Sequence, residues 1–194
     1  MVMMEAMRIL KATYPNPKRT ILVGHWNGEE QGLNGSRAFV EDHPQIVAGV
    51  VAGFNQDNGT GRVQSVSVGP FIGMDGVVRT YLSALPSQIT SHINVGNPST
   101  GPGTGGSDHA SWQCAKAPVF SLGALSWDYS NNTWHTNRDS FDKVVLDDLK
   151  NNATLVAMLA YMASEDPQTP PKYLPNTQWP NCPRATRTST ASPR

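Results

Sequence analysis

The sequence has few cysteines, no excess of charge and no long apolar run, and each of these absences excludes a class of protein. Its 194 residues carry 15 basic and 15 acidic side chains, so we expect neither a nucleic-acid-binding surface nor a polybasic membrane patch. The apolar runs are too short to span a bilayer, and the first ten residues lack the basic start and cleavage region of a signal peptide. The length suits one domain with a hydrophobic core.

The two cysteines, Cys114 and Cys182, are far apart and match no metal-binding spacing. They could form a disulfide or remain two free thiols, and Cys114 could serve simply as a small apolar residue in a helix.

Two hydrolase signatures are also missing. Without a Gly-x-Ser-x-Gly elbow a serine hydrolase is disfavoured, and the zinc motif His-Glu-x-x-His is absent too.

Segments with strand patterns alternate with helical segments along most of the chain. Strands are predicted over residues 20–25, 46–54, 62–68, 91–95 and 118–122. Helices are predicted over 1–13, 35–42, 74–85 and 142–163, with a short one beginning at 107 or 108. This order predicts an α/β three-layer sandwich with a mostly parallel central sheet, in which 62–68 lies nearer an edge. The Pro-, Thr- and Arg-rich residues 167–194 are predicted to be a disordered tail.

Two adjacent carboxylates, Glu29 and Glu30, directly follow the predicted strand 20–25. Gly28, Gly32 and Gly35 surround them and allow tight or positive-φ backbone geometry. Open α/β sheets hold their sites in loops after the carboxyl ends of strands. Two adjacent glutamates alone are more often a solvated acidic turn, so the interpretation depends on the rest of the chain.

Asp57 and His135 occupy two further loops that follow predicted strands. Each has a plain structural explanation, because Asp57 could form a turn in Asp-Asn-Gly and His135 could bond to backbone. Together, Glu30, Asp57 and His135 offer carboxylate and imidazole ligands that suit zinc, or manganese or cobalt in its place. Glu29 beside them could act as general base on a metal-bound water.

These residues carry a family resemblance. The segment Trp26–Leu33, WNGEEQGL, resembles the acidic loop of the zinc exopeptidases with co-catalytic metals, which include bacterial leucyl aminopeptidases and plasma glutamate carboxypeptidase; glutaminyl cyclase shares their fold. The resemblance implies that Glu29 is the general base and Glu30 a metal ligand. Asp57 is placed like the family's terminal carboxylate ligand, and His135 lies in a block similar to its closing His-Thr segment, where the His is a ligand.

The resemblance extends over about residues 1–165 and implies further roles. Residues 1–166 would be the C-terminal portion of a zinc peptidase domain that hydrolyses peptides, and secretion is expected from the family. Asp108, in a weaker match at 106–109, could line the substrate pocket or cap its helix. Asp139 could orient His135 or cap the helix that begins near Phe141.

One departure from the family pattern matters. The family uses two more ligands upstream of its acidic loop, a His in His-x-Asp and an Asp that bridges both metals, and neither His25 nor Glu5 is placed to replace them. The first helix also lacks an N-cap, so we expect an N-terminal truncation just past the bridging ligand. It would weaken metal binding and leave a weak or inactive enzyme. The alternative is a pseudoenzyme that keeps the fold without metal. The truncation would also expose a sheet edge that allows self-association.

Overall fold

The computed structural model describes residues 1–167, 179 and 181–187, so the predicted tail of 167–194 lies mostly outside the described residues. The helices are α1 (Val2–Thr13), α2 (Asn34–Asp42), α3 (Pro44–Gly49), α4 (Met74–Ser83), α5 (Ser87–Thr90), α6 (His109–Cys114), α7 (Tyr129–Asn132) and α8 (Leu146–Glu165), with a 3-10 turn η1 at Phe141–Lys143. The strands are β1 (Gly53–Gln56), β2 (Val63–Ser67), β3 (Asn94–Val95) and β4 (Val119–Ala124). Of the described helices, none is both long and apolar enough to cross a membrane.

The four strands form one sheet in the order β1-β4-β2-β3. β1 pairs with β4 in parallel, β2 pairs with β3 in parallel, and β2 runs antiparallel to β4. The predicted α/β class with mostly parallel pairing is therefore confirmed. The expectation that 62–68 lies near an edge is wrong, because β2 has a partner on both sides. One of these partners, β3, is only two residues long.

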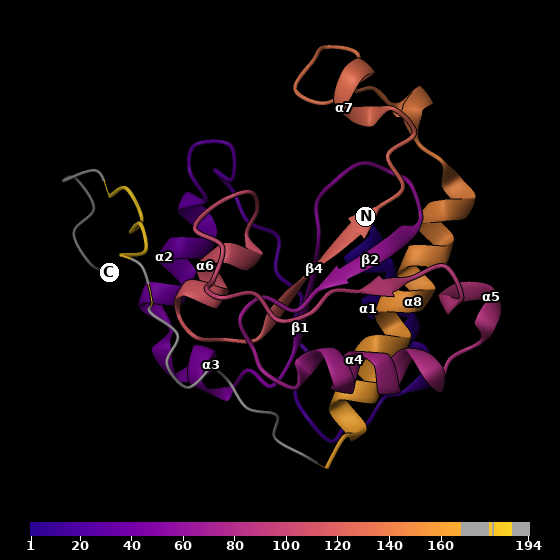
Figure 1. Cartoon of the computed structure of the whole chain (residues 1–194), viewed down its shortest axis with the longest axis horizontal. Helices are drawn as coiled ribbons and strands as arrows, with labels where there is room; N and C mark the ends of the chain where they lie inside the picture. The colour runs from indigo at the N-terminus through magenta and orange to yellow at the C-terminus, as the bar shows by residue number, and fades with distance from the viewer. Residues whose placement is uncertain (168–178, 180, 188–194) are drawn as a thin grey trace.

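The core lies between the sheet and the helices α1, α4 and α8, while α2, α3 and α6 lie on the other side of the strands (Figure 1). Phe120 and Leu122 of β4 are fully buried, as are Val78 of α4 and Leu159 of α8. Fully burying an aliphatic or aromatic side chain of this size contributes roughly 1.5–3 kcal/mol. Helix α8 thus packs against both the sheet and α1 and holds them together.

Two predicted strands differ in the structure. Residues 46–54 begin as helix α3, and only Gly53 and Phe54 join β1. Pro44 stands at the first turn of α3, where its missing N–H costs no hydrogen bond. The apolar run therefore begins as a helix, although its pattern predicts a strand throughout. Residues 20–25 form no strand. Within the described part of the chain, the backbone of residues 20–26 makes no hydrogen bond.

An apolar groove of about 140 Å³ separates residues 19–23 from residues 51–54, and α1 and α8 also contribute side chains to it. Leu22 and Val23 beside it are 63% and 41% exposed. A segment whose backbone groups are unpaired, next to apolar surface, is a site where another chain can pair. We therefore propose that this edge allows self-association.

The edge proposal predicts that Leu22→Lys shifts the purified chain toward monomer, because pairing at this edge would have to accommodate a charge. Light scattering after size exclusion measures the change. Met4→Lys is the matched control, since Met4 is also 63% exposed but does not line the groove. A wild-type chain that is already a monodisperse monomer at high concentration contradicts the proposal.

Polar anchors join the start of α8 to the segment before β2. The amide of fully buried Asn152 accepts a hydrogen bond from the Val63 N–H (2.8 Å) and donates one to the Gly61 carbonyl (2.9 Å). Asp148 is 4% exposed and accepts hydrogen bonds from Arg62 Nε (3.0 Å) and Trp127 Nε1 (3.1 Å). Burial opposes ionisation of Asp148, but these donors outweigh it and lower the pKa of the carboxyl.

Because the folded pKa of Asp148 is lowered, its contribution to stability is present above the unfolded pKa and is lost as pH falls through the folded value. We expect Asp148→Asn to reduce the free energy of unfolding by about 2 kcal/mol at pH 7. The difference in unfolding free energy between Asp148→Asn and wild type should become smaller below a pH of about 4. Urea unfolding across this pH range measures it. Asp147→Asn, at a neighbouring exposed position, should change stability little at any pH.

Candidate active site

The acidic loop folds tightly back on itself. Gly28 and Gly32 have φ of 69° and 98°, as the glycine spacing predicted. The N–H groups of Gly32 and Leu33 both donate to the Glu29 carbonyl, at 2.9 and 2.8 Å. Gly35 bonds to the Asn27 carbonyl at 2.9 Å, and a Cβ at Gly35 would lie 2.4 Å from that same oxygen. These backbone hydrogen bonds therefore fix the positions from which the Glu29 and Glu30 side chains project.

Glu30 and His135 lie in direct contact although 105 positions separate their numbers. The Oε1 atom of Glu30 lies 3.1 Å from Nε2 of His135, and both side chains are more than half exposed. His135 has a left-handed φ of 56° and packs on the Trp134 ring, with ring centroids 4.2 Å apart. The loop between α7 and η1 thus presents the imidazole to the acidic loop.

Asp57, just past β1, is oriented by a chain of hydrogen bonds. Its Oδ2 accepts from the Ser107 hydroxyl at 2.7 Å, and that hydroxyl accepts from Asn55 Nδ2 at 2.9 Å. Ser107 is 4% exposed, so the chain of bonds is shielded from solvent. Ser107 belongs to the weaker match at 106–109, whereas no sequence pattern indicates Asn55, because an asparagine does not signal a site by itself.

Negative charge converges on Glu29. Partial burial raises the pKa of Glu29, and the nearby carboxylates of Asp57, Glu30 and Asp108 raise it further, while His135 lowers it. This electrostatic coupling places four of the five predicted acidic residues, all but Asp139, in one region. A carboxyl with a raised pKa exchanges protons more readily near neutral pH, which is the property a general base needs.

Asp108 stands at the N-cap of α6, but its backbone is already helical and its side chain makes no capping bond. The expected cap position is therefore confirmed, but the Asp108 side chain does not cap a backbone N–H of the helix. The side chain is 9% exposed, its Oδ1 has no hydrogen-bond partner among the described residues, and burial raises its pKa. The neighbouring His109 also keeps an unpartnered buried Nδ1 in this part of the chain, and burial lowers its pKa. His109 ends the weaker match at 106–109, but the sequence assigns it no role in the site.

Asp139 does not hydrogen-bond to His135 within the described residues, and Ser140 rather than Asp139 precedes the turn η1 as its N-cap. Its cap interpretation is wrong, and its orienting role stays a prediction. Asp139 instead acts on Tyr129 of α7. Burial raises the pKa of Tyr129, and the charges of Asp139, Asp57 and Glu30 raise it further. Tyr129 therefore borders the same acidic region, which no sequence pattern indicated.

The donor set fits a metal ion only in part. No group of three or more His, Cys, Asp or Glu side chains with ion-binding geometry occurs in residues 1–167, 179 and 181–187. Glu30 and His135 supply two adjacent ligands and Asp57 a third donor elsewhere in the region, whereas catalytic zinc uses three protein ligands and a water. The orphaned Asp108 Oδ1 is a further buried acceptor. The roles of Glu29, Glu30, Asp57 and His135 stay predictions.

Known proteins resemble this chain in sequence and in structure. The profile of peptidase family M28 matches residues 1–160, so the chain belongs to peptidase family M28. No curated protein sequence matches it significantly. An M28 peptidase precursor from Shewanella amazonensis superposes with a TM-score of 0.77 at 21% identity over 90% of this chain. Two structures of Legionella pneumophila LapA, one of them named as an aminopeptidase, match with a TM-score of 0.63.

The LapA structures are 27% and 26% identical to this chain and cover 84% and 85% of it. The chain spans only 38% of the Shewanella protein and 46% and 45% of the two LapA chains. Family membership supports peptide-bond hydrolysis as the class of reaction. The family match over residues 1–160 includes the acidic loop, Asp57 and His135.

The tight packing of the acidic loop predicts opposite effects of one substitution at two glycines. Gly35→Ala should cost about 2 kcal/mol of unfolding free energy, because the new methyl meets the Asn27 backbone. Gly76→Ala, in α4 with nothing within 4 Å of the added Cβ, should add up to about 1 kcal/mol through helix propensity. Urea unfolding measures both, and stabilisation at both sites would show that the loop is not constrained.

Proposed function

We propose that this chain is part of a zinc-dependent exopeptidase of the aminopeptidase type, acting on peptide substrates. The observation that carries the proposal is the 3.1 Å contact between Glu30 and His135, with Glu29 next to it, in a chain of the M28 family. The structural likeness to LapA, which is named as an aminopeptidase, supports that assignment over carboxypeptidase or dipeptidase activity.

In this proposal Glu30 and His135 hold one ion and Asp57 contributes to a second. Zinc, when bound, would supply Lewis acidity that polarises the scissile carbonyl and acidifies water. Glu29 accepts a proton from the attacking water and transfers it to the amine nitrogen of the leaving fragment. The hydrogen bond from Ser107 orients the Asp57 carboxylate, and Asp108 lines the substrate pocket.

The isolated chain should bind zinc weakly and turn over slowly, because its described residues offer no complete set of three ligands. The alternative is a pseudoenzyme that keeps the M28 fold without metal. It is favoured by the same incomplete ligand set. Zinc binding by the purified chain separates the two proposals, since only the first requires Glu30 and His135 to bind an ion.

We expect zinc, measured by competition with a chromogenic chelator, to bind wild type at least about tenfold more tightly than Glu30→Gln or His135→Ala, since each loses a ligand. Glu29→Gln should retain zinc affinity but lose about 10²–10⁴-fold in hydrolysis of an aminoacyl anilide. Glu5→Gln, an exposed ion-pair residue in α1, is the control and should match wild type. Equal zinc affinity in all five proteins would refute the ligand assignment.

A further inference from the structure

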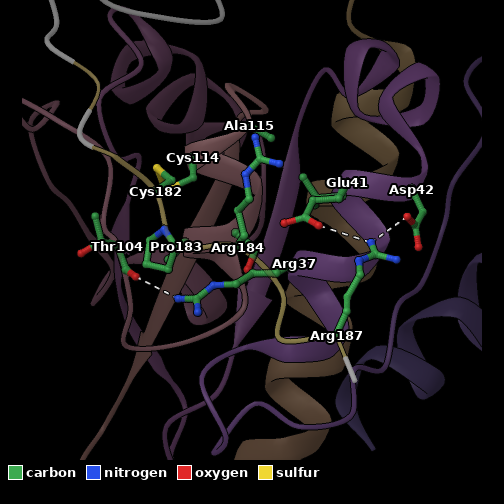
Figure 2. A pocket seen from close by; sticks show the side chains of 13 residues that line it. Arg37, Glu41, Asp42, Thr104, Cys114, Ala115, Cys182, Pro183, Arg184 and Arg187 are labelled. Atoms are coloured by element: carbon green, nitrogen blue, oxygen red, sulfur yellow. Dashed lines mark hydrogen bonds and ion pairs between the residues drawn. A yellow bond between two sulfur atoms is a disulfide. The ribbon is translucent and has the colours of Figure 1, made fainter. Parts of the chain in front are cut away.

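A segment near the C-terminus, residues 181–187, lies against helices α2 and α6; we call it the strap. Cys182 of the strap forms a disulfide with Cys114 at the last residue of α6, with a Cα–Cα distance of 5.8 Å. This pairing settles the question that the sequence left open, and Cys114 is more than a small apolar residue. Figure 2 shows the disulfide, with Pro183 and Arg184 continuing between the two helices.

The strap also contacts both ends of α2. At the far end, Arg187 pairs with Asp42 (2.8 Å) and Glu41 (3.3 Å), as the dashed lines in Figure 2 show. Glu41 also accepts a hydrogen bond from the Ala185 N–H at 3.0 Å. At the near end, the Thr186 N–H donates to Asn34 Oδ1 at 3.1 Å. Residue 34 is the first of α2 and the point where the acidic loop ends.

Asn34 joins the strap to the acidic loop through its amide. While its Oδ1 accepts from Thr186, its Nδ2 donates to the Gln31 carbonyl at 3.1 Å. Its backbone N–H also donates to the Gly28 carbonyl at 2.9 Å. A single residue therefore connects the strap to positions on both sides of Glu29 and Glu30.

The strap depends on its disulfide more than on its other contacts. A cavity of about 570 Å³ lies among the strap, α2 and α6 (Figure 2), so the strap is not packed into a core. Arg187 is 55% exposed, and exposed ion pairs contribute only about 0–1 kcal/mol. The covalent bond keeps the weak partners at high effective concentration.

We propose that the strap is a redox-controlled clamp on the acidic loop, with Asn34 as its positioning residue. When the disulfide is closed, the contacts from Thr186 through Asn34 to Gln31 hold the loop. A dithiol reductant transfers two electrons and two protons: the Sγ–Sγ bond breaks, Cys114 and Cys182 become thiols, and the dithiol becomes a disulfide. The strap then detaches from α2 and the loop exchanges between more conformations.

Hydrogen–deuterium exchange tests the clamp on the purified chain. Cys182→Ser should speed exchange about fivefold at the hydrogen-bonded amides of Gly32, Leu33, Asn34 and Gly35. This factor corresponds to the net free energy of about one hydrogen bond. Wild type treated with dithiothreitol should show the same increase, whereas the variant should not respond to the reductant. Amides of α4, which does not contact the strap, should stay unchanged in all cases and report an intact fold.

Substitution of Asn34 separates clamping from a general structural role. Asn34→Asp keeps the acceptor for Thr186 but loses the donor to Gln31, so the loop should loosen while strap amides 185 and 186 stay protected. Asn34→Ala should loosen both. Unchanged exchange in the loop after the disulfide is opened, with the strap amides deprotected, would overturn the proposal.

The effect of the clamp on function rests on the proposed peptidase site. Zinc binding and hydrogen exchange together distinguish failure of the clamp from failure of the zinc site. A looser acidic loop should lower zinc affinity of the reduced chain relative to the oxidised chain, measured by the chelator competition. If exchange changes as expected but neither form binds zinc, the clamp stands and the zinc proposal fails. If zinc binds and exchange does not change, the site stands and the clamp fails.

Discussion

The parallel pairing of β1 with β4 is the constraint on which the candidate site depends. Gly53 lies opposite Val119 and Gln56 opposite Leu122, so both strands end at the same edge of the sheet. Asp57 immediately follows β1, and the loop with His135 follows β4. Burial of Phe120 and Leu122 fixes this register, since a slip by one residue would turn them away from the core.

At that edge the structure brings several carboxylates close to Glu29. Burial and neighbouring carboxylates raise the pKa of Glu29, and burial followed by the charge of Asp57 raises that of Asp108. Carboxylates gathered in this way destabilise one another when ionised. A bound cation would relieve the repulsion, which is the physical link between this electrostatic arrangement and the proposed zinc chemistry.

The fold was largely predictable because its long elements carry strong local signals. Helices α1, α4 and α8 have clear apolar faces, and the glycines around Glu29 indicated a tight loop. The predicted strands at 20–25 and 46–54 are wrong because the local sequence pattern favours one structure and the surrounding fold another. The β-branched residues 20–25 favour an extended backbone, but a strand also needs a neighbour to bond with. In α3, the N-terminal proline outweighed an apolar run that also suits a strand.

The sequence by itself determined the residue types of the candidate site, because carboxylates and an imidazole after predicted strands are visible in one dimension. It also carried, in the acidic loop, the resemblance to the zinc exopeptidases with co-catalytic metals. Only the tertiary structure decided which groups touch. The Glu30–His135 contact, the bonds from Ser107 and Asn55 to Asp57, and the Cys114–Cys182 pairing all join residues far apart in the chain. Such contacts depend on sheet register and helix packing, which leave no local sequence signal.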